Sequence, residues 1–556
     1  MRILFTSVIA LFLATSVSAQ STWDVVYNSL QTNCVSCHSG ATPSGELDLS
    51  GTSSDVYNTL VNQVPSNATA AAKGNKLVDP GYPERSFLLR KAANSDWDSW
   101  FEYTLEGSEG SSMPQYPGTP LEHAEIEMMR QWILFGASET ETVVDADLIS
   151  DYYGGLGMAK VPPPPAPDPS EGFQLRLGTF FLEPGGEIEF FKKTKLTLPA
   201  DLEVIELEPI FNDESHHFIL YRFSGGADAD FAEGLRDEAD GEGSLFSANL
   251  VAVWQNPEPI DLPATTAYSW GANDVLDMNY HLLNYSQDSI LAADVYVNVY
   301  TQEAGVAEHE MYSQLLPIDW LSAAVGGPIG PSLVIPNDGQ PHTFEESFNV
   351  TFFGADWYIW MLGSHTHSRG TDFDIYLRNP DGSRGEQVYE GFYNTDYTFN
   401  QGYYDWEHPP NRYFENPQLH VSMSSGLTYE AEYVNNTNET LHWGSTTEDE
   451  MMLIIVQYTR AEVLGVDEAA LEDAWLQVAP NPFTDITSVK FHLEDAANVA
   501  LSVFDISGRQ VLNLPQESLG VGTHQRSLNL ETVSDGLYLV RVEVDGRVYN
   551  QRVVKQ

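Results

Sequence analysis

The middle of the chain, from residue 171 to 460, consists of short apolar runs that alternate with polar residues, and this texture constrains the fold most strongly. Examples are FILYRF, VYVNVY, FNVTFF and MLIIVQY, punctuated by Gly, Pro, Asn and Asp. Alternation with a period of two is typical of antiparallel strands that bury one face. A stretch of this length predicts two jelly-roll-like β-sandwiches in series.

The segments on either side have a different character. Residues 21–140 predict helices and loops, because WDVVYNSLQ and HAEIEMMRQWILFGA have helical apolar spacing and Gly136 can end the second helix. The proline run VPPPPAPDPS marks a semi-rigid linker, and the last segment is again all-β, which predicts an Ig-like sandwich. The predicted fold is therefore multidomain, with boundaries at 1–19 (signal peptide), 20–140 (α-helical module), 141–170 (linker), 171–305 and 306–462 (the two sandwiches), and 474–556 (C-terminal sandwich).

The chain start and the charge indicate where the protein works. MRILFTSVIALFLATSVSA has the basic start, apolar core and small residues of a secretory signal, with Gln20 as the expected mature start. No later run is long and apolar enough to predict a transmembrane segment. The formal net charge of −54 repels phosphate backbones, so nucleic acid is excluded as an expected partner.

The chain has only 2 cysteines, Cys34 and Cys37, and His38 follows them directly. This C-x-x-C-H pattern is typical of c-type haem attachment. Two thiols one helical turn apart can add to the two haem vinyl groups, and the adjacent imidazole reaches the iron. A structural disulfide and a redox dithiol are the alternatives. In an exported chain whose cysteines are all placed here, we predict covalent haem c.

The second axial ligand of the iron is predicted to be Met113. It lies in the loop GSEGSSMPQYPG, where the chain can present a thioether to a flat cofactor. Met128 and Met129 lie in an amphipathic helix and are expected in its core, while His123 lies near that helix's start. Together with CVSCH, the pieces GELDLSG, VDPGYPERSFLL, MP and WILFGA resemble the small cytochrome c modules of bacterial exported proteins.

A second group of candidate ligands lies in the β region. Alternation places both histidines of an H-x-H on one face of a strand, so His365 and His367 form a chelating pair. His216 and His217 are adjacent and point to opposite faces of a regular strand. For both to bind one ion together with His281, the strand must end, twist or bulge there.

Four segments, SHHFILYRF, LDMNYHLLNYS, SHTHSRG and TEDEMMLIIVQY, resemble in this order the copper type II ascorbate-dependent monooxygenases. That family includes peptidylglycine α-hydroxylating monooxygenase and dopamine β-monooxygenase. The resemblance implies two copper ions. One is held by His216, His217 and His281, and the other, which is catalytic, by His365, His367 and Met451. Met452 is a close rival of Met451.

The ligand types agree with copper. Thioether sulfur favours Cu(I), whereas zinc prefers a closed site without methionine. Blue copper needs a cysteine, and both cysteines are assigned to the haem. In the peptide-amidating members an arginine, an asparagine and a tyrosine anchor the substrate carboxylate; here Gly363, Leu453 and Ile455 stand at those positions. A small uncharged or apolar substrate is therefore expected besides O₂.

The C-terminal segment resembles the sorting domain of the type IX secretion system of Bacteroidetes. The matching pieces are VAPNPFTD, VALSVFDISGRQV, LGVGTHQRSLNL and DGLYLVRVEVDGRVYNQRVVKQ. The resemblance implies that the secretion machinery is a partner, and that the protein reaches the outer surface of a Gram-negative bacterium, or the medium, by way of the periplasm. An Ig-like adhesin module is the alternative from the residues alone.

Taken together, these patterns predict an exported copper-dependent monooxygenase that hydroxylates a C–H bond with O₂. The fused haem, supplied by an electron donor, would deliver electrons and replace or supplement ascorbate or another external reductant. The alternative function is a non-catalytic surface protein that uses copper and haem for electron transfer or ligand binding. In a third hypothesis the haem module senses redox state or mediates docking.

Overall fold

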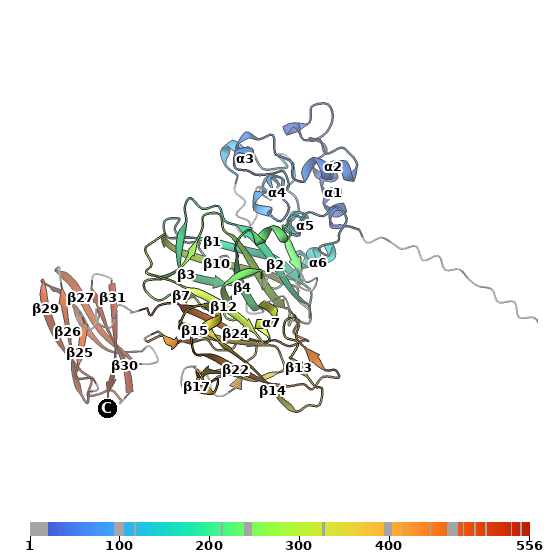
Figure 1. Cartoon of the computed structure of the whole chain (residues 1–556). Coiled ribbons are helices and arrows are strands. Elements are labelled where there is room, and N and C mark those ends of the chain that lie inside the picture. Colours follow the sequence, from blue (N-terminus) through green and yellow to red (C-terminus); the bar gives the residue numbers. More distant parts are fainter. Residues whose placement is uncertain are drawn as a thin grey trace, which may run out of the picture. The chain divides into compact units, whose positions relative to one another are not determined.

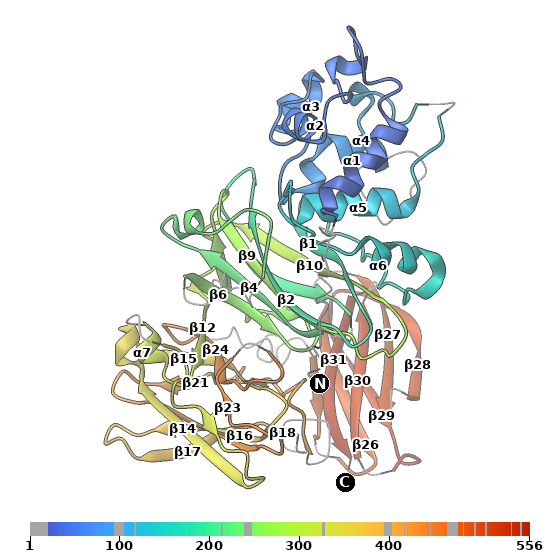
Figure 2. The same ribbon diagram turned by 90° about the vertical axis from the view of Figure 1, so that its right-hand side faces the viewer.

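The computed structural model describes residues 20–555 apart from 94–104, 116–117, 213–214, 238–246, 325–327, 394–402, 416, 445, 464–475, 482, 494–495, 506–508, 535 and 545–546. The expected signal peptide, residues 1–19, lies outside the described residues. Two compact units separate near residue 461: one comprises 1–262 and 266–461, and the other 263–265 and 462–556. Figure 1 labels the elements of both, and Figure 2 shows them from a second side.

The N-terminal part is helical, as expected, and it has its own core. Ser21 caps the first helix in a reciprocal pair with Asp24. The indoles of Trp23 and Trp132 pack with ring centroids 4.8 Å apart, and Met129 is buried beside them. The helices are α1 (Thr22–Asn33), α2 (Ser53–Leu60), α3 (Ala68–Ala72), α4 (Phe87–Ala93), α5 (His123–Leu134) and α6 (Ala146–Asp151), with short turns at Ser44–Glu46, Pro83–Arg85, Gly107–Glu109 and Tyr152–Leu156. Gly136 follows α5 with a φ of +89°, a conformation that suits a helix end.

Helix α5 is docked on the first sandwich by buried polar groups. Arg130 and Gln131 donate to the carbonyl oxygen of Thr179 at 2.6 and 2.7 Å, and Arg130 also pairs with Glu127 at 2.6 Å. Because an uncompensated buried charge is costly, this network requires the two parts to stay together. Part of the expected linker is also ordered against the sandwich, since Ile149 of α6 is buried in one cluster with Phe181 and Met128.

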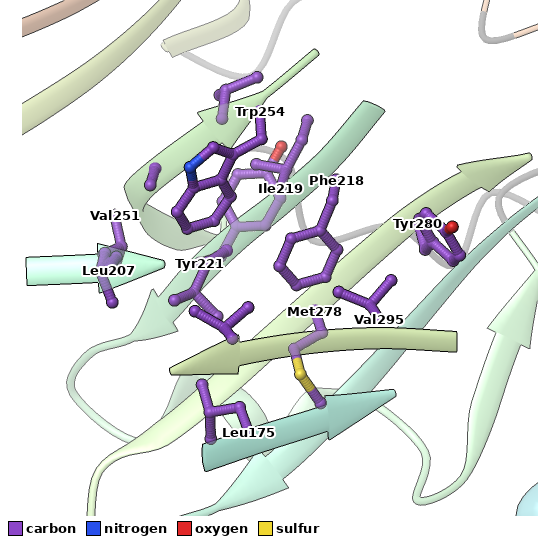
Figure 3. Close-up of a cluster of buried hydrophobic side chains, with 14 of the residues drawn as sticks. Leu175, Leu207, Phe218, Ile219, Tyr221, Val251, Trp254, Met278, Tyr280 and Val295 are labelled. Carbon is purple, nitrogen blue, oxygen red and sulfur yellow. The ribbon is translucent and has the colours of Figure 1, made fainter. Parts of the chain in front are cut away.

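The first sandwich consists of two sheets around one core. Side chains from both sheets meet in Figure 3, among them Leu175 and Val295 from one sheet and Phe218 and Met278 from the other. One sheet has the order β1 (Gly172–Leu182), β10 (Leu291–Glu303), β3 (Leu202–Ile210), β8 (Thr266–Trp270), β11 (His309–Glu310), with β7 (Ile260–Asp261) beside β3. The other has the order β5 (Leu235–Asp237), β2 (Glu187–Lys195), β9 (Val275–Leu283), β4 (Ser215–Phe223), β6 (Ala248–Trp254).

The second sandwich begins at β12, since β11 still pairs with β8 of the first. One sheet has the order β12 (Tyr312–Pro317), β24 (Met452–Thr459), β15 (Trp357–Thr366), β20 (Arg412–Tyr413), with β21 (Leu419–Val421) beside β15. The other has the order β14 (Pro341–Asn349), β22 (Gly426–Val434), β16 (Gly370–Arg378), β17 (Arg384–Glu390). Smaller elements are η5 (Ala227–Asp230), α7 (Trp320–Ala324) and the pairs β13 (Val334–Ile335) with β23 (Leu441–His442) and β18 (Phe392–Tyr393) with β19 (Tyr403–Tyr404).

One strand expectation is wrong in part. FNVTFF was expected to continue as a strand, but β14 ends at Asn349 and Val350–Phe353 forms a 3₁₀ turn. Gly354 follows in the left-handed region with a φ of +75°, which ends the turn. The turn buries Val350 and leaves Phe352 58% exposed.

The C-terminal unit has two antiparallel sheets around a separate apolar core. Their orders are β25 (Leu476–Ala479), β26 (Ile486–Leu493), β29 (Gly522–Asn529), and β28 (Gln510–Leu519), β27 (Ala497–Asp505), β30 (Gly536–Val544), β31 (Arg547–Lys555). The expectation of a mainly β chain with several sheets is confirmed. Within the described ranges, no helix has the length and apolar character needed to cross a membrane.

Candidate metal centre

A β-bulge in β4 brings its two adjacent histidines together. Opposite β9, Ser215 pairs with Leu282 and His217 pairs with His281, so His216 is an extra residue in the ladder. A bulge turns the extra side chain away from strict alternation. The bulge that His216 and His217 need in order to bind one ion is therefore present. Their ring centroids lie 5.2 Å apart.

The H-x-H pair lies at the end of β15 in the second sandwich. His365 pairs with Leu453 of β24, and His367 follows the last strand residue, Thr366. Their ring centroids are 5.3 Å apart. The backbone N–H of His367 donates to the carboxylate of Glu450 at 3.0 Å, which fixes the turn after the strand.

All five histidines form one cluster between the two sandwiches. One ligand nitrogen each of His216, His217 and His281 lies within 4.8 Å of the others, and the same holds for His216, His365 and His367. The two ligand groups expected from the sequence are therefore adjacent, and His216 belongs to both. None of the five residues is more than 5% exposed.

The four histidines other than His216 each have one ring nitrogen hydrogen-bonded to an oxygen atom. His281 donates to Glu187 at 2.8 Å, and His217 contacts Glu189 at 3.2 Å. Gln255 and the carbonyl oxygen of Asp449 accept from Nδ1 of His365 and His367, at 2.7 and 3.2 Å. Such acceptors commonly set the tautomer and orientation of metal-binding histidines.

Five of the six remaining ring nitrogens are buried without a partner. Buried nitrogens with no hydrogen bond are both nitrogens of His216, Nδ1 of His217 and His281, and Nε2 of His367. An unsatisfied buried polar atom costs about 1–3 kcal/mol. Converging, unpaired imidazole nitrogens backed by fixed acceptors are the arrangement that a metal ion requires, so these residues fit the expected metal.

Burial favours the uncharged form of His216, His365 and His367, while Glu189 stays charged. Burial lowers the pKa of His367 to about 4 and holds the pKa of His216 and His365 well below its usual range. Burial opposes ionisation of Glu189, but the hydrogen bond from His217 and nearby imidazoles bring its pKa down to about 2. Neutral imidazoles near pH 7 are the form that binds metals.

Met451 is better placed than Met452 to bind a metal at the histidine cluster. Met451 directly precedes β24 and packs against the cluster that includes Leu453, the cross-strand partner of His365. Directly opposed residues share a face of the sheet. Met452 is fully buried in the core of the second sandwich, opposite Thr366. Ligation by Met451 stays a prediction.

Several residues near the cluster were not found from the sequence. Glu187 and Glu189 are spaced so that both lie on one face of β2, a pattern that could have been paired with the histidines. Trp406 lies with its ring centroid 5.2 Å from that of His216, and Tyr404 hydrogen-bonds Thr366 at 2.8 Å. Trp406 thus places an indole beside the histidines.

The C-x-x-C-H motif forms a turn after α1. Backbone N–H groups of Cys37 and His38 donate to the carbonyl oxygen of Cys34 at 3.1 and 3.0 Å. Both thiols are free, and Nδ1 of His38 is buried without a partner. Burial raises the pKa of Cys34 to about 11. These residues fit thioether attachment and axial ligation of a haem.

Met113 lies in the loop before α5 and is half-buried. Its backbone N–H donates to the carbonyl oxygen of Lys91 at 2.8 Å, and this hydrogen bond connects the loop to helix α4. Met128 and Met129 are buried, as expected for core residues, and His123 is the first residue of α5. Ligation of iron by Met113 stays a prediction.

Comparison with known proteins identifies the C-terminal region. Residues 477–556 match the family model described as a secretion system C-terminal sorting domain. The expectation of a type IX sorting domain is therefore confirmed, and the chain is exported to the cell surface or beyond it, as in Bacteroidetes. No curated protein matches the chain.

Solved structures offer only weak likenesses. PorZ, a surface component of the type IX secretion system of Porphyromonas gingivalis, is 16% identical over 18% of this chain and 14% of its own, with a TM-score of 0.12. Lactobacillus rhamnosus beta-glucuronidase is 12% identical over 44% of this chain and 45% of its own, with a TM-score of 0.13. This chain spans less than half of either structure's length, and TM-scores this low carry no argument about fold or activity.

Proposed function

We propose that the protein is a copper-dependent monooxygenase at the cell surface, and that its helical domain carries haem c and supplies electrons. The observation that carries this proposal is the buried cluster of five histidines with unpaired, converging nitrogens. The order of the histidine segments, which resembles the copper type II monooxygenases, adds support. Cluster and segments lie at the junction of the two sandwiches.

The donor set favours copper over other metals. The cluster offers imidazoles, with Met451 directly before the adjoining strand β24, and imidazole with thioether suits copper. The carboxylates of Glu187 and Glu189 are engaged by His281 and His217 and act as orienting acceptors. When bound here, copper would supply the one-electron chemistry with O₂ that hydroxylates a C–H bond.

The residues around the cluster support an uncharged substrate. Leu453 and Ile455, at the positions of carboxylate-anchoring residues in the peptide-amidating enzymes, are 5% and 2% exposed and pack in the shared apolar cluster. Gly363 lies opposite Ile455 and offers no charge. With Trp406 next to His216, the apolar surroundings favour a small apolar substrate.

The docking of the helical domain supports its role as donor. Phe135, just after α5, contacts Phe190 of β2 with ring centroids 5.5 Å apart. The next residue toward the cluster along β2 is Glu189, the partner of His217. A single strand therefore links the helical domain to the histidines, and the buried network around Arg130 keeps the domain in place.

Stopped-flow spectroscopy tests the donor role. We expect haem reduced anaerobically in the copper-loaded protein to be reoxidised on mixing with O₂ much faster than in the copper-free protein, because the copper centre withdraws its electrons. Equal rates of reoxidation in the two forms would contradict the proposal. Loading with zinc in place of copper is the control, since zinc occupies nitrogen sites without redox chemistry.

A second candidate function is electron transfer without turnover. It is favoured by the near-complete burial of the histidines and by the indole of Trp406 beside His216. In that case the copper-loaded protein would reduce an external electron acceptor. Its oxygen uptake in the presence of small apolar compounds would not exceed that of the copper-free protein.

A further inference from the structure

We propose that Gln255 of the first sandwich is a positioning residue for His365 of the second, and that it fixes Nε2 as the metal-binding nitrogen of this histidine. Gln255 directly follows β6, whereas His365 lies in β15. The predicted ligand group of His365, His367 and Met451 is therefore completed by a residue of the other sandwich. This inference rests on the proposed function only for the identity of the metal.

The side-chain amide of Gln255 contacts two adjacent residues of β15. Its Nε2 donates to the carbonyl oxygen of Ser364 at 3.0 Å, and its Oε1 lies 2.7 Å from Nδ1 of His365. Gln255 is 6% exposed, and the other two residues are buried as well. A buried amide needs hydrogen-bond partners at both ends, and here the histidine and its neighbour provide them.

The two contacts together determine which nitrogen of neutral His365 carries the proton. A carbonyl oxygen only accepts hydrogen bonds, so the amide nitrogen of Gln255 must face Ser364. The amide oxygen then faces His365 and also only accepts, so Nδ1 is the donor. The lone pair that can bind a metal is consequently on Nε2. His367 has the same tautomer, because the carbonyl oxygen of Asp449 accepts from its Nδ1 at 3.2 Å.

The core of the first sandwich keeps Gln255 in place. Trp254, the residue before it, is 2% exposed and stacks on Phe218 of β4 with ring centroids 5.6 Å apart (Figure 3). The backbone that carries the amide is therefore anchored in this core. A metal ligand is held most precisely by a residue whose own rotamer is fixed by packing and hydrogen bonds, and Gln255 has both.

A second link joins the first sandwich to the segment that leads to Met451. The carboxylate of Glu187, in β2, accepts from the backbone N–H of Thr447 at 3.0 Å and from its hydroxyl at 2.8 Å. Thr447 is followed by Asp449, whose carbonyl oxygen accepts from His367, and then by Met451. Both segments that supply the predicted ligand group therefore contact the first sandwich close to their ligands.

Nuclear magnetic resonance of the metal-free full-length protein, labelled with ¹⁵N-histidine, measures the tautomer directly, and His365→Ala assigns the signal. We expect His365 to carry its proton on Nδ1 in the wild type and in Gln255→Glu, which keeps an acceptor oxygen. In Gln255→Leu the acceptor is lost, so the two tautomers should mix. Gln457→Leu is the matched control, because Gln457 is also buried and also crosses between the sandwiches, where it donates to the hydroxyl of Tyr268 at 2.9 Å.

Titration of the same variants with copper measures the effect on binding. We expect one of the two copper ions to bind about 10–100-fold more weakly in Gln255→Leu than in the wild type, the usual cost of losing a residue that orients a metal ligand. Gln255→Glu should recover most of this affinity, and Gln457→Leu should bind copper like the wild type. Circular dichroism checks that each variant is folded. If Gln255→Leu does not fold, the shorter Gln255→Asn, which withdraws the acceptor oxygen, takes its place.

The outcomes separate this inference from the proposed function. A proton on Nε2 of His365 in the wild type, a fixed Nδ1 proton in folded Gln255→Leu, or unchanged copper affinity in that variant would overturn the inference. An equal loss of affinity in Gln457→Leu would also overturn it, because the effect would then come from the junction as a whole. A wild type that binds no copper would overturn the proposed function, while the tautomer measured without metal would still decide this inference.

Discussion

Replacing Met451 with isoleucine should lower copper-dependent oxygen uptake by more than about 100-fold, the upper end of what loss of a supporting residue costs at metal sites. Isoleucine keeps an apolar side chain of similar volume but removes the sulfur that favours Cu(I). The haem spectrum should not change, because Met451 lies in the second sandwich and the C-x-x-C-H motif follows α1. Oxygen uptake and visible spectroscopy on the same sample measure both effects.

Met452→Leu is the matched control for this substitution. Met452 is 0% exposed in the core of the second sandwich, and a Met-to-Leu exchange there costs less than about 1.5 kcal/mol. We expect this variant to retain oxygen uptake. If Met451→Ile kept normal activity while Met452→Leu lost it, the rival methionine would be the ligand; normal activity in both would remove methionine from the site.

The double variant Cys34→Ala, Cys37→Ala should lose covalent haem completely. The two thiols are free and lie on one turn with His38, and no other cysteine exists in the chain. The copper centre is built from other residues, so ascorbate-driven oxygen uptake should persist while haem-driven uptake disappears. Haem staining after denaturing electrophoresis, with oxygen uptake for each reductant, measures the two effects.

Ser36→Ala serves as the control, since Ser36 lies between the two cysteines and is exposed. It should keep covalent haem. Haem that survives denaturation in the double cysteine variant would contradict thioether attachment. Loss of ascorbate-driven uptake in that variant, with the sandwiches still folded, would mean that the helical domain does more than donate electrons.

The sequence predicted the elements better than the contacts between them. Period-two runs identified β4, β10 and β24, and helical spacing identified α1 and α5, because each pattern reflects local burial. The strand predicted for FNVTFF ends early because a 3₁₀ turn, which Gly354 terminates, takes its place. A glycine with positive φ is difficult to recognise from the sequence. The pairing of β11 with β8 of the first sandwich depends on tertiary contacts.

The candidate site shows the same division. The sequence identified the histidines as candidate metal ligands. Joint binding by His216 and His217 required a bulge, but the sequence alone did not show that one forms. That His216 lies beside His365 follows from the packing of two sandwiches, which no local pattern encodes. Gln255 and Trp406 reach the cluster from elements distant in sequence, so neither carried a recognisable signal.

The central claim is that one chain holds both a copper centre and a covalent haem. Metal analysis together with haem quantitation on the purified, copper-reconstituted protein tests it most directly. We expect two copper ions and one haem per chain, with the copper lost and the haem kept when the cluster histidines are replaced. Haem without copper, or zinc bound in preference to copper at the histidines, would contradict it.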